Sequence, residues 1–161
     1  MSYKIDRRDV QILSILQNDA RISNVALAER VNLSAAACWE RVRKLEAGGV
    51  IRKYRSEVAL ERMPGTISFM LLVTLKSHKT SDFTIFENDI RQSSNVIRCV
   101  SIGGGYDYIV EVVVRRMEDY KRFMSEFLEK NSNVNTCSAH VITKSVKAES
   151  VDLQMLYDNV E

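Results

Sequence analysis

The sequence of 161 residues predicts an α+β fold, in which a small helical region precedes a larger region of alternating strands and helices. Three observations predict this division. Apolar residues recur at helical spacing in the first third, whereas a strand-helix-strand pattern occurs twice in the rest. Lys and Arg outnumber Asp and Glu by 11 to 6 in residues 1–55, but acidic residues outnumber basic ones by 15 to 12 in residues 56–161. We therefore expect two modules with different binding partners.

The first third predicts three short helices. Asp6 is placed as the N-cap of a helix over DRRDVQILSILQ, Ser23 as that of NVALAERV, and Ser34 as that of AAACWERVRKLEA. Gly48 and Gly49 follow the third helix and provide a left-handed stop. Because only three or four residues join the second and third helices, this segment has the arrangement of a helix-turn-helix.

The predicted third helix has an apolar face, which repeats at i, i+4 and i+7 from Cys38, and a polar face. The residues of the polar face are Trp39, Glu40, Arg43 and Lys44, with Arg41 at its margin. An α-helix fits the major groove of DNA, where Arg contacts guanine and Glu accepts from cytosine. Arg52 and Lys53 follow the helix and are placed to contact phosphates. The alternative is a three-helix bundle with a solvated charged face, but the helix spacing and the charge asymmetry favour double-stranded DNA as the partner.

The remaining two thirds contain an internal repeat. SNVIRC (residues 94–99) and SNVNTC (132–137) match at four of six positions, and each follows a helical pattern. Strands are predicted before these helices, over 68–76 and 108–116, and each hexamer begins a further strand. The order β-α-β-β-α-β predicts a ferredoxin-like domain, with both helices on one face of a four-stranded antiparallel sheet.

The predicted sheet has apolar residues on both faces. Both alternating sets of SFMLLVTLK are largely apolar, and in YIVEVVVRR Ile109 and Val113 lie opposite Tyr108 and Val110. A strand with one face in water alternates more clearly. Because the helices cover one face only, we expect the other to pack against a second copy. The resulting homodimer would present two recognition helices about 34–36 Å apart.

Composition and motifs argue against a secreted protein, a membrane protein, a metal-binding protein and an enzyme. MSYKIDRRDV lacks the apolar core of a signal peptide, and no apolar run reaches the ~20 residues of a membrane helix, so we expect a cytoplasmic protein without a membrane partner. The three cysteines form no CxxC pair, and the two histidines complete no zinc pattern. No nucleophile-base pair or paired-carboxylate site is recognisable. We expect reduced thiols, no metal, no cofactor and no enzymatic activity.

The stretch GGGYD lies where a hairpin between the second and third strands is expected. Consecutive glycines supply positive φ in tight turns. A phosphate-binding loop fits poorly, because Tyr108 stands where GxGxxG has its third glycine and a strand follows. Glycines also let backbone N–H groups approach a carboxylate. Asp107 either pairs with an ammonium group or caps its own turn, and both interpretations stay open.

Together these motifs resemble the Lrp/AsnC family of bacterial and archaeal transcriptional regulators. The resemblance rests on IDRRDVQILSILQNDAR, SNVALAERVNLS, CWERVRKLEAGGVI, GGGYDY and VITKSVK, in this order across about residues 5–147. It implies a winged helix-turn-helix, a RAM domain (regulation of amino acid metabolism) and dimers that assemble into tetramers or octamers. It also implies a nucleoid-associated regulator whose oligomeric state and DNA affinity respond to an amino acid or a derivative.

The resemblance also implies segment boundaries. The predicted segments are a DNA-binding domain (1–55), a linker strand or hinge (56–66), a ligand-binding and oligomerisation domain (67–147) and a tail with a possible short helix (148–161). Ser150 is placed to cap that helix. The apolar stripe of the tail docks either on the chain's own core or on a neighbouring subunit.

Candidate site residues follow from the motifs and the resemblance. The candidate DNA-binding residues are Ser23, Ser34, Ala35, Ala36, Trp39, Glu40, Arg41, Arg43, Lys44, Arg52 and Lys53. The candidate effector-binding residues are Ser101, Gly103, Gly104, Gly105, Tyr106, Asp107, Thr136, Ser138 and His140. One alternative function is a DNA-independent enzyme similar to the sirohaem decarboxylases, but the later region lacks the His or Arg clusters such a site needs. The other is an oligomeric amino-acid-binding module, against which the basic first third argues.

Overall fold

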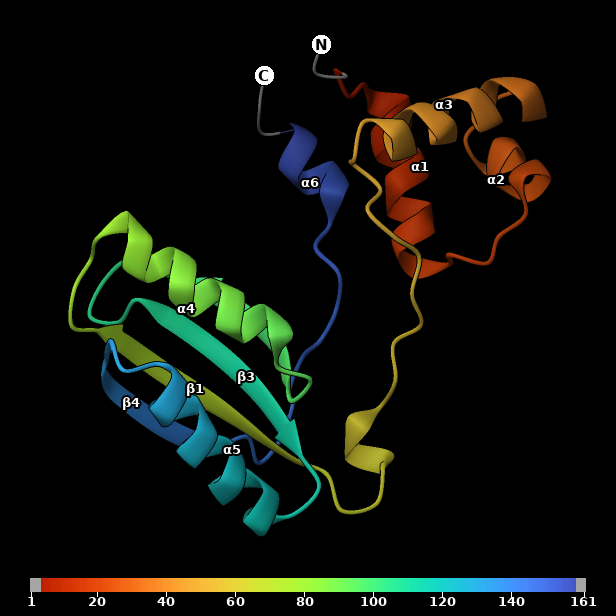
Figure 1. Ribbon diagram of the computed structural model, residues 1–161. Helices are drawn as coiled ribbons and strands as arrows, with labels where there is room; N and C mark the ends of the chain where they lie inside the picture. Colours follow the sequence, from red (N-terminus) through yellow and green to blue (C-terminus); the bar gives the residue numbers. More distant parts are fainter. Residues whose placement is uncertain (1–3, 159–161) are drawn as a thin grey trace. The chain divides into compact units, whose positions relative to one another are not determined.

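The computed structural model describes residues 4–158 and divides into two compact units (Figure 1). One unit comprises the described residues up to Val58 together with those from Lys147 onwards, and the other comprises Ala59–Val146. The expected linker strand is absent, because residues 56–66 contain only the 3₁₀ turn η1 (Leu60–Arg62). The tail belongs to the same unit as the amino-terminal helices.

The amino-terminal unit begins with the three predicted helices. They are α1 (Arg7–Asn18), α2 (Asn24–Arg30) and α3 (Ala35–Ala47). All three predicted N-caps are confirmed, since the side chains of Asp6, Ser23 and Ser34 each accept a hydrogen bond from the backbone N–H three residues later. The buried residues that hold the helices together are Ile12, Leu27, Ala28, Val31, Cys38 and Leu45.

Two residues with positive φ end α2 and α3. Asn32 has φ 53° in the turn between α2 and α3, and the N–H of Leu33 donates to the carbonyl of Ala28 across the end of α2. Gly49 has φ 69° after α3 and confirms the predicted left-handed stop. Glycine adopts this conformation without a steric penalty, and asparagine tolerates it better than most residues. The short α2–α3 turn therefore fixes how these helices follow each other.

The tail forms a helix that packs on the chain's own α1. This helix is α6 (Leu153–Asp158), and it is capped by Asp152, whose carboxylate accepts from the N–H groups of Gln154 and Met155. The predicted cap at Ser150 is therefore wrong. Val10 of α1 is 5% exposed although it lies outside the three-helix core, and it lines a small cavity together with Gln154 and Tyr157. Of the two docking sites left open for the tail, the structure uses the one on the same chain.

The second unit has the predicted ferredoxin-like order. Its elements are β1 (Ile67–Leu75), α4 (Thr80–Gln92), β2 (Val96–Ser101), β3 (Tyr108–Val114), α5 (Met117–Lys130) and β4 (Val134–Val141). The sheet order is β2-β3-β1-β4, and every neighbouring pair is antiparallel. The α+β fold expected from the sequence is thus confirmed.

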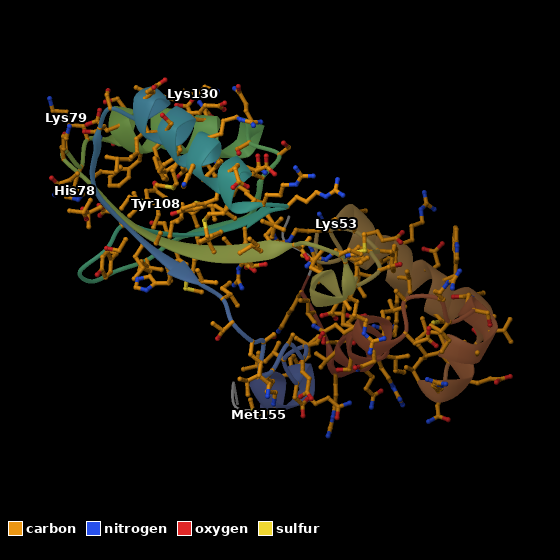
Figure 2. All side chains as sticks on the ribbon, turned by 90° about the horizontal axis from the view of Figure 1, so that it is seen from below. Lys53, His78, Lys79, Tyr108, Lys130 and Met155 are labelled. Carbon is orange, nitrogen blue, oxygen red and sulfur yellow. The ribbon has the colours of Figure 1, made fainter. Side chains whose placement is uncertain are left out.

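The two faces of this sheet differ in what covers them. Figure 2 shows α4 and α5 on the same side of the sheet, above the central strands. On that side Leu71 of β1 lies beside Val110 of β3, and both are fully buried. One residue further along, Leu72 lies beside Ile109 on the opposite side, where both are only partly buried. We call the side of Leu72 and Ile109 the open face.

No helix within residues 4–158 combines the length and the apolar character that crossing a bilayer requires.

Candidate DNA interface and effector site

The exposed face of α3 carries most of the predicted base-reading side chains. Trp39 is 51% exposed, and the guanidinium carbon of Arg43 lies 5.4 Å from the centre of its ring. This separation is typical of a cation–π contact, which orders both side chains on the helix surface. Glu40 and Lys44 are exposed on the same helix, and its first residues, Ala35 among them, are small and exposed. Small residues at the start of the helix allow its backbone to approach a groove closely.

Hydrogen bonds from neighbouring helices set the orientation of α3. Asn24 at the start of α2 donates from Nδ2 to the carbonyl oxygen of Ala35, at 2.8 Å. Arg8 of α1 donates from Nη1 to the carbonyl oxygen of Val31, also at 2.8 Å, where α2 ends. The bond to Val31 satisfies a carbonyl at the end of α2, which otherwise needs water or a cap, and the bond to Ala35 ties the start of α3 to the start of α2. The three helices therefore form one preorganised unit for binding.

Arg41, a predicted DNA contact, forms ion pairs within the amino-terminal unit. Its Nη1 lies 2.6 Å from Oδ2 of Asp6 and 2.9 Å from Oδ1 of Asp9, at the start of α1. Asp9 has no exposed side-chain surface, whereas the side chain of Arg41 is 29% exposed. The hydrogen bonds that Arg41 donates to Asp6 and to Asp9 raise its pKa above the ordinary value. Arg41 holds α3 against α1, and its contact with DNA stays a prediction.

The two serine N-caps keep a donor for a ligand. The hydroxyls of Ser23 and Ser34 each accept from a backbone N–H at 3.2 Å, and both residues are exposed. A hydroxyl that accepts in this way still has its own proton to donate. A phosphate oxygen near the start of either helix would receive this proton together with the favourable helix dipole.

The segment after α3 carries the predicted phosphate contacts. Arg52 and Lys53 are exposed, and the residues from 52 to 59 form no strand. Tyr54 donates from its hydroxyl to Glu46 near the end of α3, at 2.9 Å. Burial, followed by this bond to a carboxylate, raises the pKa of Tyr54 to about 12. The bond connects the basic segment to the end of α3 on the same unit.

The glycine loop connects β2 to β3, as predicted. The N–H of Ile102 donates to the carbonyl of Asp107 at 2.9 Å, which closes the loop. Gly104 has φ 126°, a conformation that side chains other than glycine rarely adopt. A Cβ atom built at Gly103, Gly104 or Gly105 would meet no heavy atom within 4 Å. The loop backbone is therefore open to a small molecule.

Asp107 holds the glycine loop against the end of β1. Its Oδ2 accepts from the N–H of Leu75 at 2.7 Å, and its Oδ1 lies 3.0 Å from Nε2 of His78. Its own N–H donates to the carbonyl of Val73 at 2.9 Å. The carboxylate thus does not cap its own turn, which rules out one of the two interpretations. The other interpretation is that Asp107 pairs with an ammonium group. His78 already occupies Oδ1, so such a group would have to replace it or bind beside it.

Comparison with known proteins identifies the family. Residues 5–52 match the family described as "Winged helix-turn-helix DNA-binding", and residues 68–152 match "Lrp/AsnC ligand binding domain". The transcriptional regulatory protein DoeX of Halomonas elongata is 35% identical over 152 residues, which is 94% of this chain and 96% of the relative. The chain belongs to the Lrp/AsnC family.

Two further Lrp/AsnC relatives support this assignment. The leucine-responsive regulatory protein of Escherichia coli is 32% identical over 143 residues, covering 89% of this chain and 87% of the relative. A transcriptional regulator from Neisseria meningitidis, crystallised as a complex with L-Met, superposes with a TM-score of 0.84 at 27% identity, over 95% of this chain and 99% of the other. This chain is accordingly a DNA-binding transcriptional regulator with a ligand-binding domain.

The predicted effector residues on the strands of this Lrp/AsnC chain lie on both faces of the sheet. Thr136, Ser138 and His140 lie on β4 on the open face, where the hydroxyl of Thr136 is 2.6 Å from that of Thr74. Ser101 lies on β2, at the opposite edge of the sheet, and pairs with Tyr108 on the helix-covered side. Thr136 lies near the loop, because its partner Thr74 precedes Leu75, whose N–H donates to Asp107. The roles of these residues in effector binding stay a prediction.

The sequence did not indicate that His78 contacts Asp107, nor that Tyr108, Glu87 and Arg91 form a hydrogen-bonded group beneath α4. Tyr108 donates from its hydroxyl to Glu87 at 3.1 Å, and Glu87 also pairs with Arg91 at 2.8 Å. These residues line a half-open pocket of about 380 Å³ between α4 and β2. Cys99 lines it too, and burial raises the pKa of this thiol to about 11, in keeping with a reduced cysteine. Within residues 4–158, no group of three or more His, Cys, Asp or Glu side chains is placed to hold a metal ion.

Proposed function

We propose that this Lrp/AsnC regulator binds its operator as a homodimer, with one α3 in each of two adjacent major-groove half-sites. We further propose that a small molecule with the charged groups of an amino acid binds at the glycine loop and changes DNA affinity. The observation that carries the DNA proposal is the division of α3. Cys38 and Leu45 are fully buried on one face, while the other face exposes Trp39 and Arg43 to solvent.

The proposed contacts divide by chemistry. Arg43, Glu40 and Trp39 lie on the exposed face of α3, where a bidentate guanidinium reads guanine, a carboxylate accepts from cytosine, and an apolar edge contacts a thymine methyl group. The proposed phosphate contacts are Ser23, Ser34, Lys44, Arg52 and Lys53. Phosphate contacts supply affinity and register, whereas base contacts supply specificity.

The proposed dimer covers the open face. Met70 is 37% exposed there, and Leu72, Ile109 and Val113 are partly buried neighbours in the same sheet. Glu111 lies between Ile109 and Val113 on the same face, so this face is mixed apolar and polar. A partly apolar sheet face that no helix of its own unit covers can serve as an interface between copies. Because a dimer places two recognition helices on one duplex, dimer contact through the open face and DNA binding are coupled. Assembly of these dimers into tetramers or octamers, acting at the bacterial nucleoid, remains a prediction from the family.

The proposed effector has an ammonium and a carboxylate group. The glycine loop offers open backbone that a carboxylate can approach, and Asp107 supplies a negative charge beside it. The structural relative complexed with L-Met is consistent with a ligand of this class. An effector acts only through a difference in its affinity for two states of the protein, so binding at this loop must favour one assembly or DNA-bound state.

Replacing Arg43 with alanine tests the DNA proposal. We expect affinity for operator DNA to fall about tenfold or more, because a bidentate base contact contributes roughly 1–3 kcal/mol. Gel shifts on the DNA upstream of the gene, at several salt concentrations with competitor DNA, measure this. The matched control is Arg122→Ala, which removes an exposed arginine of α5 in the other unit. Equal binding by wild type and Arg43→Ala would contradict the proposed role of α3.

A further inference from the structure

We propose that His78 is an internal competitor for Asp107, so that an effector must displace its imidazole before its ammonium group binds the carboxylate. His78 then sets the affinity for the effector, as a positioning residue outside the glycine loop itself. This inference rests on the proposed effector site. It also names the effector class, namely molecules with an unblocked ammonium group.

The geometry of Asp107 leaves one oxygen with an exchangeable partner. Oδ2 accepts from the backbone N–H of Leu75 at 2.7 Å, inside the end of β1, and the N–H of Asp107 donates to the carbonyl of Val73. These backbone bonds fix the position of the carboxylate. Oδ1 instead has the side-chain partner His78, with Nε2 at 3.0 Å. The side chain of Asp107 is 20% exposed, so a ligand can reach it.

His78 is placed to leave without disturbing the fold. It lies in the connection between β1 and α4, at the end of the sheet, as Figure 2 shows. Its side chain is 62% exposed, and its ring centre lies 5.8 Å from that of Phe83, in a tilted contact. Neither contact buries the imidazole. Rotation of a mostly exposed side chain costs little compared with breaking a backbone bond of the sheet.

Exchange of partners explains why an ammonium group is required. An ammonium group is a compact cation with three donors, so it replaces the single imidazole donor and adds full charge beside the carboxylate. A ligand whose amino group is replaced by hydroxyl gains a neutral hydrogen bond only. Departure of His78 also breaks the side-chain contact between the glycine loop and the β1–α4 connection. Binding of a ligand at the loop thereby releases the β1–α4 connection, which leads into α4.

The test compares effector affinity in three variants of the full chain. A thermal-shift screen of the twenty common amino acids on wild type selects the probe, and calorimetry then measures its affinity. We expect His78→Phe, which keeps a planar ring but removes the donor, to bind the probe about fivefold more tightly, the equivalent of one hydrogen bond. Asp107→Asn should lose binding. The control Lys79→Ala, a change at the next residue, should match wild type within about twofold.

A second readout follows His78 directly. The chain has two histidines, so imidazole NMR signals are few, and the signal missing in His78→Phe identifies residue 78. We expect the saturating amino acid to shift this signal, and its α-hydroxy analogue to leave it in place. Unchanged or weaker binding by His78→Phe, with binding still lost in Asp107→Asn, would overturn the role of His78 and leave the effector site standing. Failure of every amino acid to bind both wild type and His78→Phe would overturn the effector site itself.

Discussion

Replacing Arg41 with alanine is expected to lower the free energy of unfolding of the amino-terminal unit by about 3 kcal/mol. The guanidinium pairs with Asp6 and with Asp9, whose side chain is fully buried. Without Arg41, the buried carboxylate of Asp9 keeps its desolvation cost but loses the charge and the hydrogen bond of this guanidinium. Urea denaturation followed by circular dichroism measures the change. Arg43→Ala, an exposed change two residues away that loses only the cation–π contact with Trp39, should alter the free energy of unfolding by less than about 1 kcal/mol.

The same variant separates the structural role of Arg41 from a role in DNA binding. At a temperature where Arg41→Ala remains folded, we expect its DNA affinity to stay close to that of wild type. A folded Arg41→Ala protein with tenfold weaker binding would show that the guanidinium contacts DNA. In the double variant Arg41→Met with Asp9→Asn, removal of both charges should restore part of the lost stability.

The pH dependence of stability gives a further prediction for Arg41 and its two carboxylate partners, Asp6 and Asp9. Burial alone would raise the pKa of Asp6, but the N–H of Asp9 and the guanidinium of Arg41 outweigh burial and lower the pKa below its ordinary value of 3.8. A depressed pKa in the folded state contributes stability that is present above pH 3.8 and lost as pH falls through the folded value. Arg41→Ala should therefore lose less stability than wild type over this acidic range.

Replacing Leu72 with glutamate on the open face is expected to convert the proposed dimer to a monomer. Leu72 lies on the central strand β1, beside Ile109 and Ser138, so a dimer would bury the new carboxylate without a cation. Operator affinity should fall by about 10²-fold or more, because the two recognition helices are no longer linked. Size-exclusion chromatography with light scattering measures the mass, and gel shift measures the affinity.

The matched control adds the same charge to the covered side of the unit. Ser125 is exposed on α5, so Ser125→Glu should leave both the mass and the DNA affinity unchanged. A dimer that persists in Leu72→Glu would place the interface elsewhere on the chain. A monomeric wild type would contradict the proposed interface altogether.

Local patterns in the sequence were sufficient for most elements of the fold. The helix caps and Gly49 act through bonds within a few residues, so short motifs identify them. The apolar residues at both alternating sets of positions in β1 and β3 indicated that both faces of the sheet carry apolar residues there. Ser150 and Asp152 are both capping residue types, however, and only the folded tail selects Asp152.

The errors and omissions concern contacts between distant segments. Arg41 lies 35 residues from Asp6, and helical periodicity placed it at the margin of a face without revealing which carboxylates adjoin it. His78 lies 29 residues from Asp107, and the two meet because β1 ends beside the glycine loop. Ser101 and Thr136 were both predicted to line the effector site, and the sheet order places their strands on opposite edges. For His78 and for the pair Ser101 and Thr136, the order of the strands in the sheet was the missing information.

The fluorescence of Trp39 tests most directly the claim that α3 enters a DNA groove. This residue is the sole tryptophan of the chain and is half exposed on the proposed reading face. Addition of operator duplex should change its emission and protect it from acrylamide, over the same concentrations that shift the DNA in a gel. Saturating DNA that leaves both the emission and the acrylamide quenching of Trp39 unchanged would mean that the duplex binds another surface.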